Sequence, residues 1–397
     1  MKIQHNAQIV KKLTGGGTDS SSLGSIHKCG DKIKRFVFAR NSSGEAAGQA
    51  TAGGRYFGLD LIRFLAILFV MCAHFFARVG YINVPIYGER YFIATAFREI
   101  ITSCVPLFFM LSGYLMKNKT PVRSYYAKII RLLVLFLVIG TMCNLYRIFV
   151  YHEQLSTVDW LFSFTNFSAN TYSWYLRAYI GLFVLVPFLN MMIHGLKSKK
   201  QFHILLLSLI LVFSLPVFFG RIGLQVSNYW KDFYPIVYYL LGAYISIYKP
   251  CLRKGVLIAG IFIVSVLGAV LLFLTRYGQK LGSAAVEYGD FFYLLITVML
   301  FLLLYQVKAP RVHFLCRFVS SVSRVSYSMF LISWIYDRTI YGFILVPFVS
   351  SFYDRLLFIV LTVPAVFLLS YLSALVLEGS YNFVAAKGKQ LFFKQTV

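Results

Sequence analysis

The sequence predicts an all-α polytopic membrane protein, and three observations predict it. Hydrophobic residues make up 59% of the 397 residues and charged residues only 13%, whereas soluble domains are about one quarter charged. The apolar residues gather in runs of about 20, the length that a helix needs to cross the hydrocarbon core of a bilayer. These runs are continuous rather than alternating, which argues against a strand barrel. The sequence therefore predicts one membrane domain of about ten transmembrane helices.

The loops between the apolar runs predict how the helices are oriented. The net charge of +25 comes from 39 Lys and Arg against 14 Asp and Glu. Alternate loops carry most of the basic residues, as cytoplasmic loops do. This alternation predicts that both termini lie in the cytoplasm, which needs an even number of spans. No recognition motif accompanies the charge, so we predict no nucleic-acid partner. The ten predicted spans are 59–79, 93–116, 129–151, 173–193, 202–219, 232–249, 255–275, 289–307, 326–347 and 355–377.

The chain divides into three parts. Residues 1–55 are rich in Gly, Ser and Thr, carry nine Lys or Arg and three acidic residues, and are predicted to be a disordered, basic cytoplasmic tail. Residues 56–378 hold the ten spans, and residues 379–397 are predicted to be a short, basic cytoplasmic tail. The charge of the first tail suits contact with anionic membrane lipid. The six cysteines form no CxxC pair, and no metal site is predicted.

Two ionisable residues bracket an apolar stretch of the first span, which reads RFLAILFVMCAH from Arg63 to His74. Residues eleven apart on an α-helix differ by only about 20° in direction and by about 16 Å in height. Arg63 and His74 therefore share a face, with Arg63 near the cytoplasmic end and His74 beyond the membrane midplane. Asp60, three residues before Arg63, lies on a neighbouring part of that face and can pair with it.

Each of these residues has two interpretations. Ionisable groups at membrane depth usually face the bundle interior or a water-filled cavity, but an arginine near a helix end often extends to the interface. His74 lies too deep for that. It is either a neutral histidine bonded to a neighbouring helix or a general base, because imidazole can take a proton from a hydroxyl near neutral pH.

The stretch GLDLIRFLAILFVMCAHFF at 58–76 resembles the first transmembrane helix of acyltransferase family 3. These bacterial membrane enzymes acylate sugars of surface polysaccharides and related glycans. Their hallmark is an arginine and a histidine separated by ten residues, which Arg63 and His74 match. Four further motifs resemble the family's patterns in the same order, over about 55–377: VPLFFMLSGYLM at 105–116, YYAKIIRLL at 125–133, WYLRAYIGLFVLVPFLN at 174–190 and SRVSYSMFLISWIYD at 323–337.

The sequence departs from the family's pattern at several positions. Lys128 stands where the basic motif usually has an arginine, with Arg131 three residues later. Tyr172 stands two residues before Trp174, where the family often has a histidine. Ser333 replaces the histidine that often ends the ninth-helix motif. These departures favour the branch of the family without an attached periplasmic domain.

The resemblance implies a membrane-bound O-acyltransferase, most often an O-acetyltransferase. It implies acyl-CoA, chiefly acetyl-CoA, as co-substrate and no bound cofactor. Because CoA carries several negative charges, Arg63, Lys128 and Arg131 are predicted to bind the donor near the cytoplasmic face. His74 is predicted to be the catalytic base, either directly or through an acyl-histidine. The implied acceptor is a hydroxyl of a cell-surface polysaccharide, O-antigen or lipid-linked glycan, at the bacterial inner membrane.

Further polar and aromatic side chains are candidates for lining an internal cavity. Ser112 and Gly113 can instead form a small-residue contact with another helix. Tyr172 and Trp174 can stack on a sugar or adenine, or anchor a span at the interface. Asp337 and Arg338 are further charges within a predicted span. The cavity candidates are Asp60, Ser112, Tyr114, Tyr172, Trp174, Arg98 and Glu99.

Two other classes of protein remain as alternatives. The first is a polytopic transporter or flippase of a glycan or lipid-linked sugar, which would suit many helices with buried charges. Such proteins usually show internal repeats, and the two halves of this sequence show none. The second is an unrelated membrane O-acyltransferase with a deep histidine, which keeps the chemistry and changes the fold.

Overall fold

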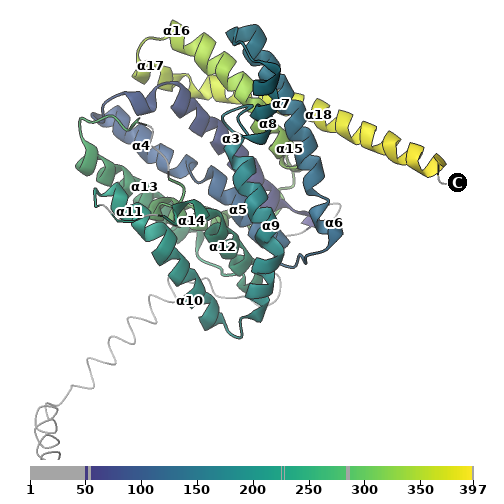
Figure 1. Cartoon of the computed structure of the whole chain (residues 1–397). Coiled ribbons are helices and arrows are strands. Elements are labelled where there is room, and N and C mark those ends of the chain that lie inside the picture. Colours follow the sequence, from purple (N-terminus) through teal and green to yellow (C-terminus); the bar gives the residue numbers. More distant parts are fainter. Residues whose placement is uncertain (1–49, 52–54, 225, 228, 283–286, 396–397) are drawn as a thin grey trace, which may run out of the picture.

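The structure is a computed structural model that describes residues 50–51, 55–224, 226–227, 229–282 and 287–395. The predicted tail 1–55 lies almost wholly outside the described residues. Its described part joins a two-residue antiparallel pair between β1 (Ala50–Thr51) and β2 (Arg55–Tyr56). The rest of the described chain is dominated by helices, which pack side by side in one bundle (Figure 1).

The helices follow the predicted spans in order. The last of them, α18, continues through most of the predicted tail 379–397 and extends out of the bundle (Figure 1). The helices are α3 (Phe57–Arg78), α4 (Glu89–Ile101), α5 (Cys104–Met116), α6 (Arg123–Tyr126), α7 (Ile129–Tyr151), α8 (Thr157–Thr165), α9 (Trp174–Gly195), α10 (Lys199–Leu209), α11 (Leu215–Arg221), α12 (Tyr234–Tyr248), α13 (Lys254–Arg276), α14 (Phe291–Leu304), α15 (His313–Tyr336), α16 (Val346–Phe348), α17 (Phe352–Leu357) and α18 (Ile359–Gln395), with 3-10 turns η1 (Tyr81–Asn83) and η3 (Lys231–Phe233) and π-helices η2 (Ile210–Ser214) and η5 (Asp337–Leu345).

Within the described residues, eight helical stretches rather than ten are long and apolar enough to cross a membrane. The predicted count is wrong at segments 232–249 and 289–307, which form α12 of 15 residues and α14 of 14 residues. At 1.5 Å per residue these helices rise about 22 and 21 Å, short of the roughly 30 Å hydrocarbon core. Most side chains of α12 are buried against neighbouring helices, so its apolar composition fills the protein core.

A close contact between α5 and α12 forms the centre of the bundle. A Cβ atom on Gly113 would lie 1.8 Å from the carbonyl oxygen of Tyr239, and one on Gly242 would lie 1.9 Å from that of Met110. Backbones approach this closely only where side chains are absent. The interpretation of this part of the second span as a small-residue helix contact is confirmed for Gly113.

We expect Gly113→Ala to destabilise the folded protein, because the added methyl group forces α5 and α12 apart. Overpacking of this kind costs about 1–3 kcal/mol, and more where backbone must move. The measurement is the melting temperature of the purified protein in detergent. Gly181→Ala on α9 is the matched control, since a Cβ there meets no heavy atom within 4 Å. Equal melting temperatures for the two variants would contradict the contact.

Asn190, near the end of α9, holds this helix against the α5–α12 pair. Its side-chain amide donates to the carbonyl oxygens of Met116 and Lys119, both at 2.8 Å. Its side-chain oxygen accepts a hydrogen bond of 2.6 Å from the hydroxyl of Tyr239. A buried amide satisfied in this way rigidifies its surroundings, and it fixes the wall that α9 contributes to the candidate site.

Candidate active site

His74 lies on the face of α3 that meets η5 and the residues just before α9. Its Nδ1 atom is 2.9 Å from Oδ2 of Asp337, a fully buried residue at the first position of η5. The hydroxyl of Tyr172 donates to the same carboxylate oxygen at 2.7 Å. Because a carboxylate only accepts hydrogen bonds, Nδ1 carries the proton. This tautomer leaves Nε2 of His74 as the nitrogen that can take a proton from a substrate.

Aromatic rings hold the imidazole of His74 in place. The ring of Tyr172 stacks on it with centroids 3.6 Å apart and planes 14° apart. Phe330 of α15 contacts the same imidazole, with ring centroids 6.2 Å apart. Arg78, one helical turn after His74, lies beside the hydroxyl of Tyr172. Packing and hydrogen bonds together fix the orientation of the ring, as a base that acts on a bound substrate requires.

Arg63 points from α3 toward α15 inside the bundle. Its Nη1 atom donates to Oγ of Ser323 at 2.7 Å and lies 3.7 Å from Oδ1 of Asp60. The hydroxyl of Ser323 donates in turn to Asp60 at 2.6 Å. The predicted pairing of Arg63 with Asp60 is confirmed. Arg63 is held by a second helix here, which is not the geometry of an arginine that extends to the lipid interface.

A cavity of about 230 Å³ lies between α3, α5, α7, α9 and α15. Arg63 lines it, as do Ser112, Tyr175 and Tyr179. The ring of Phe330 also lines it and, on the side of His74, contacts the imidazole. His74 itself does not line the cavity, and Phe330 is in contact both with the cavity and with the imidazole.

The other residues predicted at the donor end lie around this cavity without lining it. Lys128 is exposed just before α7. Arg131, one turn later, pairs with Glu378 of α18 and lies over the ring of Tyr381. Tyr114 packs on α14, away from the cavity. No observation here tests the roles of Lys128 and Arg131, and they stay predictions.

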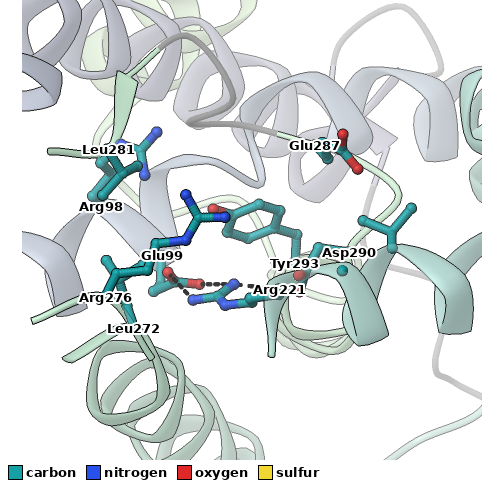
Figure 2. A pocket seen from close by; sticks show the side chains of 11 residues that line it. Arg98, Glu99, Arg221, Leu272, Arg276, Leu281, Glu287, Asp290 and Tyr293 are labelled. Atoms are coloured by element: carbon teal, nitrogen blue, oxygen red, sulfur yellow. Dashed lines mark hydrogen bonds and ion pairs between the residues drawn. The ribbon is translucent and has the colours of Figure 1, made fainter. Parts of the chain in front are cut away.

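Arg98 and Glu99 belong to a second, separate cavity (Figure 2), of about 170 Å³. There Glu99 accepts two hydrogen bonds from the guanidinium of Arg221, at 2.6 and 3.3 Å. Arg221 also lies 3.4 Å from Asp290. Trp174 lines neither of these two cavities; it is stacked on Tyr288 with centroids 5.4 Å apart.

Sequence reasoning finds the charges of the site but misses their partners. Asp337 is visible as a carboxylate within an apolar segment, yet it is 263 positions from His74 and no local pattern joins them. Its neighbour Arg338 faces the rings of Trp334 and Tyr151. The π-helix that begins at Asp337 is the kind of local irregularity that often marks a functional site, and it is visible only in the structure.

The comparisons with known proteins bear on the same part of the chain. The family model of the acyltransferase domain of acyltransferase family 3 matches residues 56–375. This range includes α3 to α17 and the first part of α18, to residue 375. No match was found among curated proteins or among solved structures. Since the matched range covers most of the 397 residues, the chain belongs to acyltransferase family 3.

Proposed function

We propose that this acyltransferase moves an acyl group, most simply acetyl, from cytoplasmic acyl-CoA to a hydroxyl of a cell-surface polysaccharide, O-antigen or lipid-linked glycan. The observation that carries the proposal is the His74–Asp337 pair beside a cavity lined by Arg63. Membership of the family supports acyl transfer over the alternative of a transporter or flippase. The proposed location is the inner membrane of a bacterium, with the donor reaching the site from the cytoplasm.

The donor end is proposed to be the end of the cavity at Arg63. CoA phosphates need cations, and a guanidinium can hold a phosphate through two parallel hydrogen bonds. Lys128 and Arg131 lie on the same predicted face of the membrane. Lys117 lies there as well. Its pKa is lowered, mainly by burial and secondly by the positive charge of the nearby Lys249. This crowding of cations favours a polyanionic ligand, and the flexible arm of CoA can then enter the cavity toward His74.

The chemical step is proposed to occur at Nε2 of His74. This atom takes the proton of the acceptor hydroxyl while the hydroxyl oxygen attacks the thioester carbonyl carbon. The new C–O bond forms and the C–S bond breaks, and the CoA thiolate leaves with the proton that His74 returns. Asp337 holds Nδ1–H and stabilises the imidazolium between the two transfers. An acyl-histidine route uses the same nitrogen as nucleophile.

We expect Arg63→Ala to weaken acyl-CoA binding about 10- to 100-fold, because a charge-assisted hydrogen bond to a phosphate is lost. The measurement is the Kd for acetyl-CoA by titration calorimetry with the purified protein. Arg147→Ala is the matched control, since Arg147 pairs with Glu153 at the other end of α7, at 2.7 Å. An unchanged Kd in Arg63→Ala would remove Arg63 from the donor site.

A further inference from the structure

The second cavity, which Figure 2 shows, lies between α4, α11, α13 and α14. It shares no lining residue with the cavity at Arg63. Its volume of about 170 Å³ equals that of about five or six water molecules in the liquid. Arg98, Arg221 and Arg276 reach it together with three carboxylates. Ionisable groups within spanning segments are expensive, and they usually mark a functional pathway or site.

Each of the three carboxylates of this cavity lies close to a cation. Arg221 holds Glu99 through two hydrogen bonds and lies 3.4 Å from Asp290. Glu287 pairs with Lys231 at 3.0 Å. The cavity is thus lined by three arginines and three carboxylates, and Lys231, outside the lining, is a further partner of Glu287. Arg276 is then left as a lining cation without a carboxylate partner among the described residues, which favours an anionic ligand.

Arg276 supplies an accessible cation at the edge of this cavity. It is the last residue of α13 and is partly exposed. Within the described part of the chain, no side chain forms an ion pair or hydrogen bond with its guanidinium. Deeper inside, the buried Nε of Arg221 also has no acceptor among the described residues. Donors of this kind suit the oxygen atoms of a carboxylate or phosphate.

A series of contacting aromatic rings joins the segment that carries Glu287 and Asp290 to His74. Tyr288, between Glu287 and Asp290, stacks on Trp174 with centroids 5.4 Å apart. Trp174 contacts Tyr175 at 6.3 Å, Tyr175 contacts Phe330 at 5.1 Å, and Phe330 contacts His74 at 6.2 Å. Trp174 and Tyr288 are only partly buried, and the apolar face of a sugar ring packs well on such rings.

We propose that this cavity binds an anionic group, a carboxylate or phosphate, of the acceptor glycan, whose sugar ring lies over Trp174 and Tyr288. The assignment of the ligand as the acceptor rests on the proposed function. The loop after α13 is hydrogen-bonded to Ile86, in the loop that follows the outer end of α3, whereas Arg63 lies near the predicted cytoplasmic end of α3. Donor and acceptor then approach His74 from opposite sides of the membrane.

The test is binding of defined probes to the purified full-length protein in detergent, by titration calorimetry. Glucuronate and glucose 1-phosphate represent acidic sugars, glucose is the neutral control, and geranyl phosphate represents a phosphate on a lipid. The variants are Arg276→Gln, Arg276→Lys and Leu281→Trp, which fills the cavity. Arg147→Ala is the control, since Arg147 lines neither cavity. Melting temperatures establish that each variant is folded.

The acidic probes are expected to bind at least about tenfold more tightly than glucose, since each charged hydrogen bond contributes about that factor. Arg276→Gln and Leu281→Trp are expected to weaken this binding about tenfold, Arg276→Lys to weaken it less, and Arg147→Ala to leave it unchanged. Binding of geranyl phosphate alone, with the same sensitivity to Arg276→Gln, assigns the anion to a lipid-linked phosphate.

Two results overturn the proposal: glucose and the acidic probes bind equally, or Arg276→Gln and Leu281→Trp both leave binding unchanged. The binding of these probes is measured without any acyl transfer taking place. A failure of acyl transfer in the assays of His74 is therefore distinguishable from a failure of this site to bind anions.

Discussion

His74→Ala is expected to lower the rate of acyl transfer by about 10²–10⁴-fold, the usual contribution of a positioned general base. The variant removes the nitrogen that accepts the proton but leaves Arg63 and the cavity walls in place. The Kd for acetyl-CoA is therefore expected to change little. The measurement is kcat, from the appearance of the free CoA thiol in the presence of acceptor.

A second histidine provides the control for this variant. His203 is exposed on α10 and its Nε2 lies 2.7 Å from the hydroxyl of Tyr244, away from the cavity at Arg63. His203→Ala is expected to retain full kcat. If both variants lose activity equally, or if neither does, His74 is not the base.

Asp337→Asn is expected to lower kcat by about 10²–10⁴-fold with little change in shape. The amide of asparagine can donate as well as accept, so it no longer selects the tautomer with the proton on Nδ1. The imidazolium that forms during transfer also loses the charge that stabilises it. A similar substitution beside the histidine of a serine protease has an effect of about this size. The measurement is again kcat, together with the Kd for acetyl-CoA.

Two further variants separate this role from general damage to the fold. Tyr172→Phe removes the second hydrogen bond to Asp337 and keeps the stacked ring, so a loss of about tenfold is expected. Asp354→Asn, at an exposed position of α17, is expected to be neutral. Full activity in Asp337→Asn would show that the carboxylate serves packing alone.

Much of the fold can be predicted because apolar runs and loop charges are local properties of the sequence. Segment 129–151, for example, forms α7 over the same residues. Segments 232–249 and 289–307 are different. Their apolar composition predicts helices correctly, but composition alone does not distinguish a lipid-facing helix from one buried against protein. The short lengths of α12 and α14 become visible only when the chain is folded.

The site divides in the same way. The shared face of Arg63 and His74 follows from helical periodicity, and so does the pairing of Arg63 with Asp60. The partners from distant helices do not follow, because they depend on packing: Ser323 beside Arg63, and Asp337 beside His74. Adjacent charges at Arg98 and Glu99 are visible in the sequence, whereas their separation from the cavity at Arg63 is a property of the whole bundle.

Acyl transfer by this chain, with His74 as the base, can be measured directly. Its most direct test is the transfer of radiolabel from acetyl-CoA to envelope glycan by the purified protein, with wild type and His74→Ala in parallel. If His74 is the base, wild type labels the glycan and His74→Ala labels it at least about 100-fold less, at equal acetyl-CoA binding. Equal labelling of the glycan by the two proteins would contradict it.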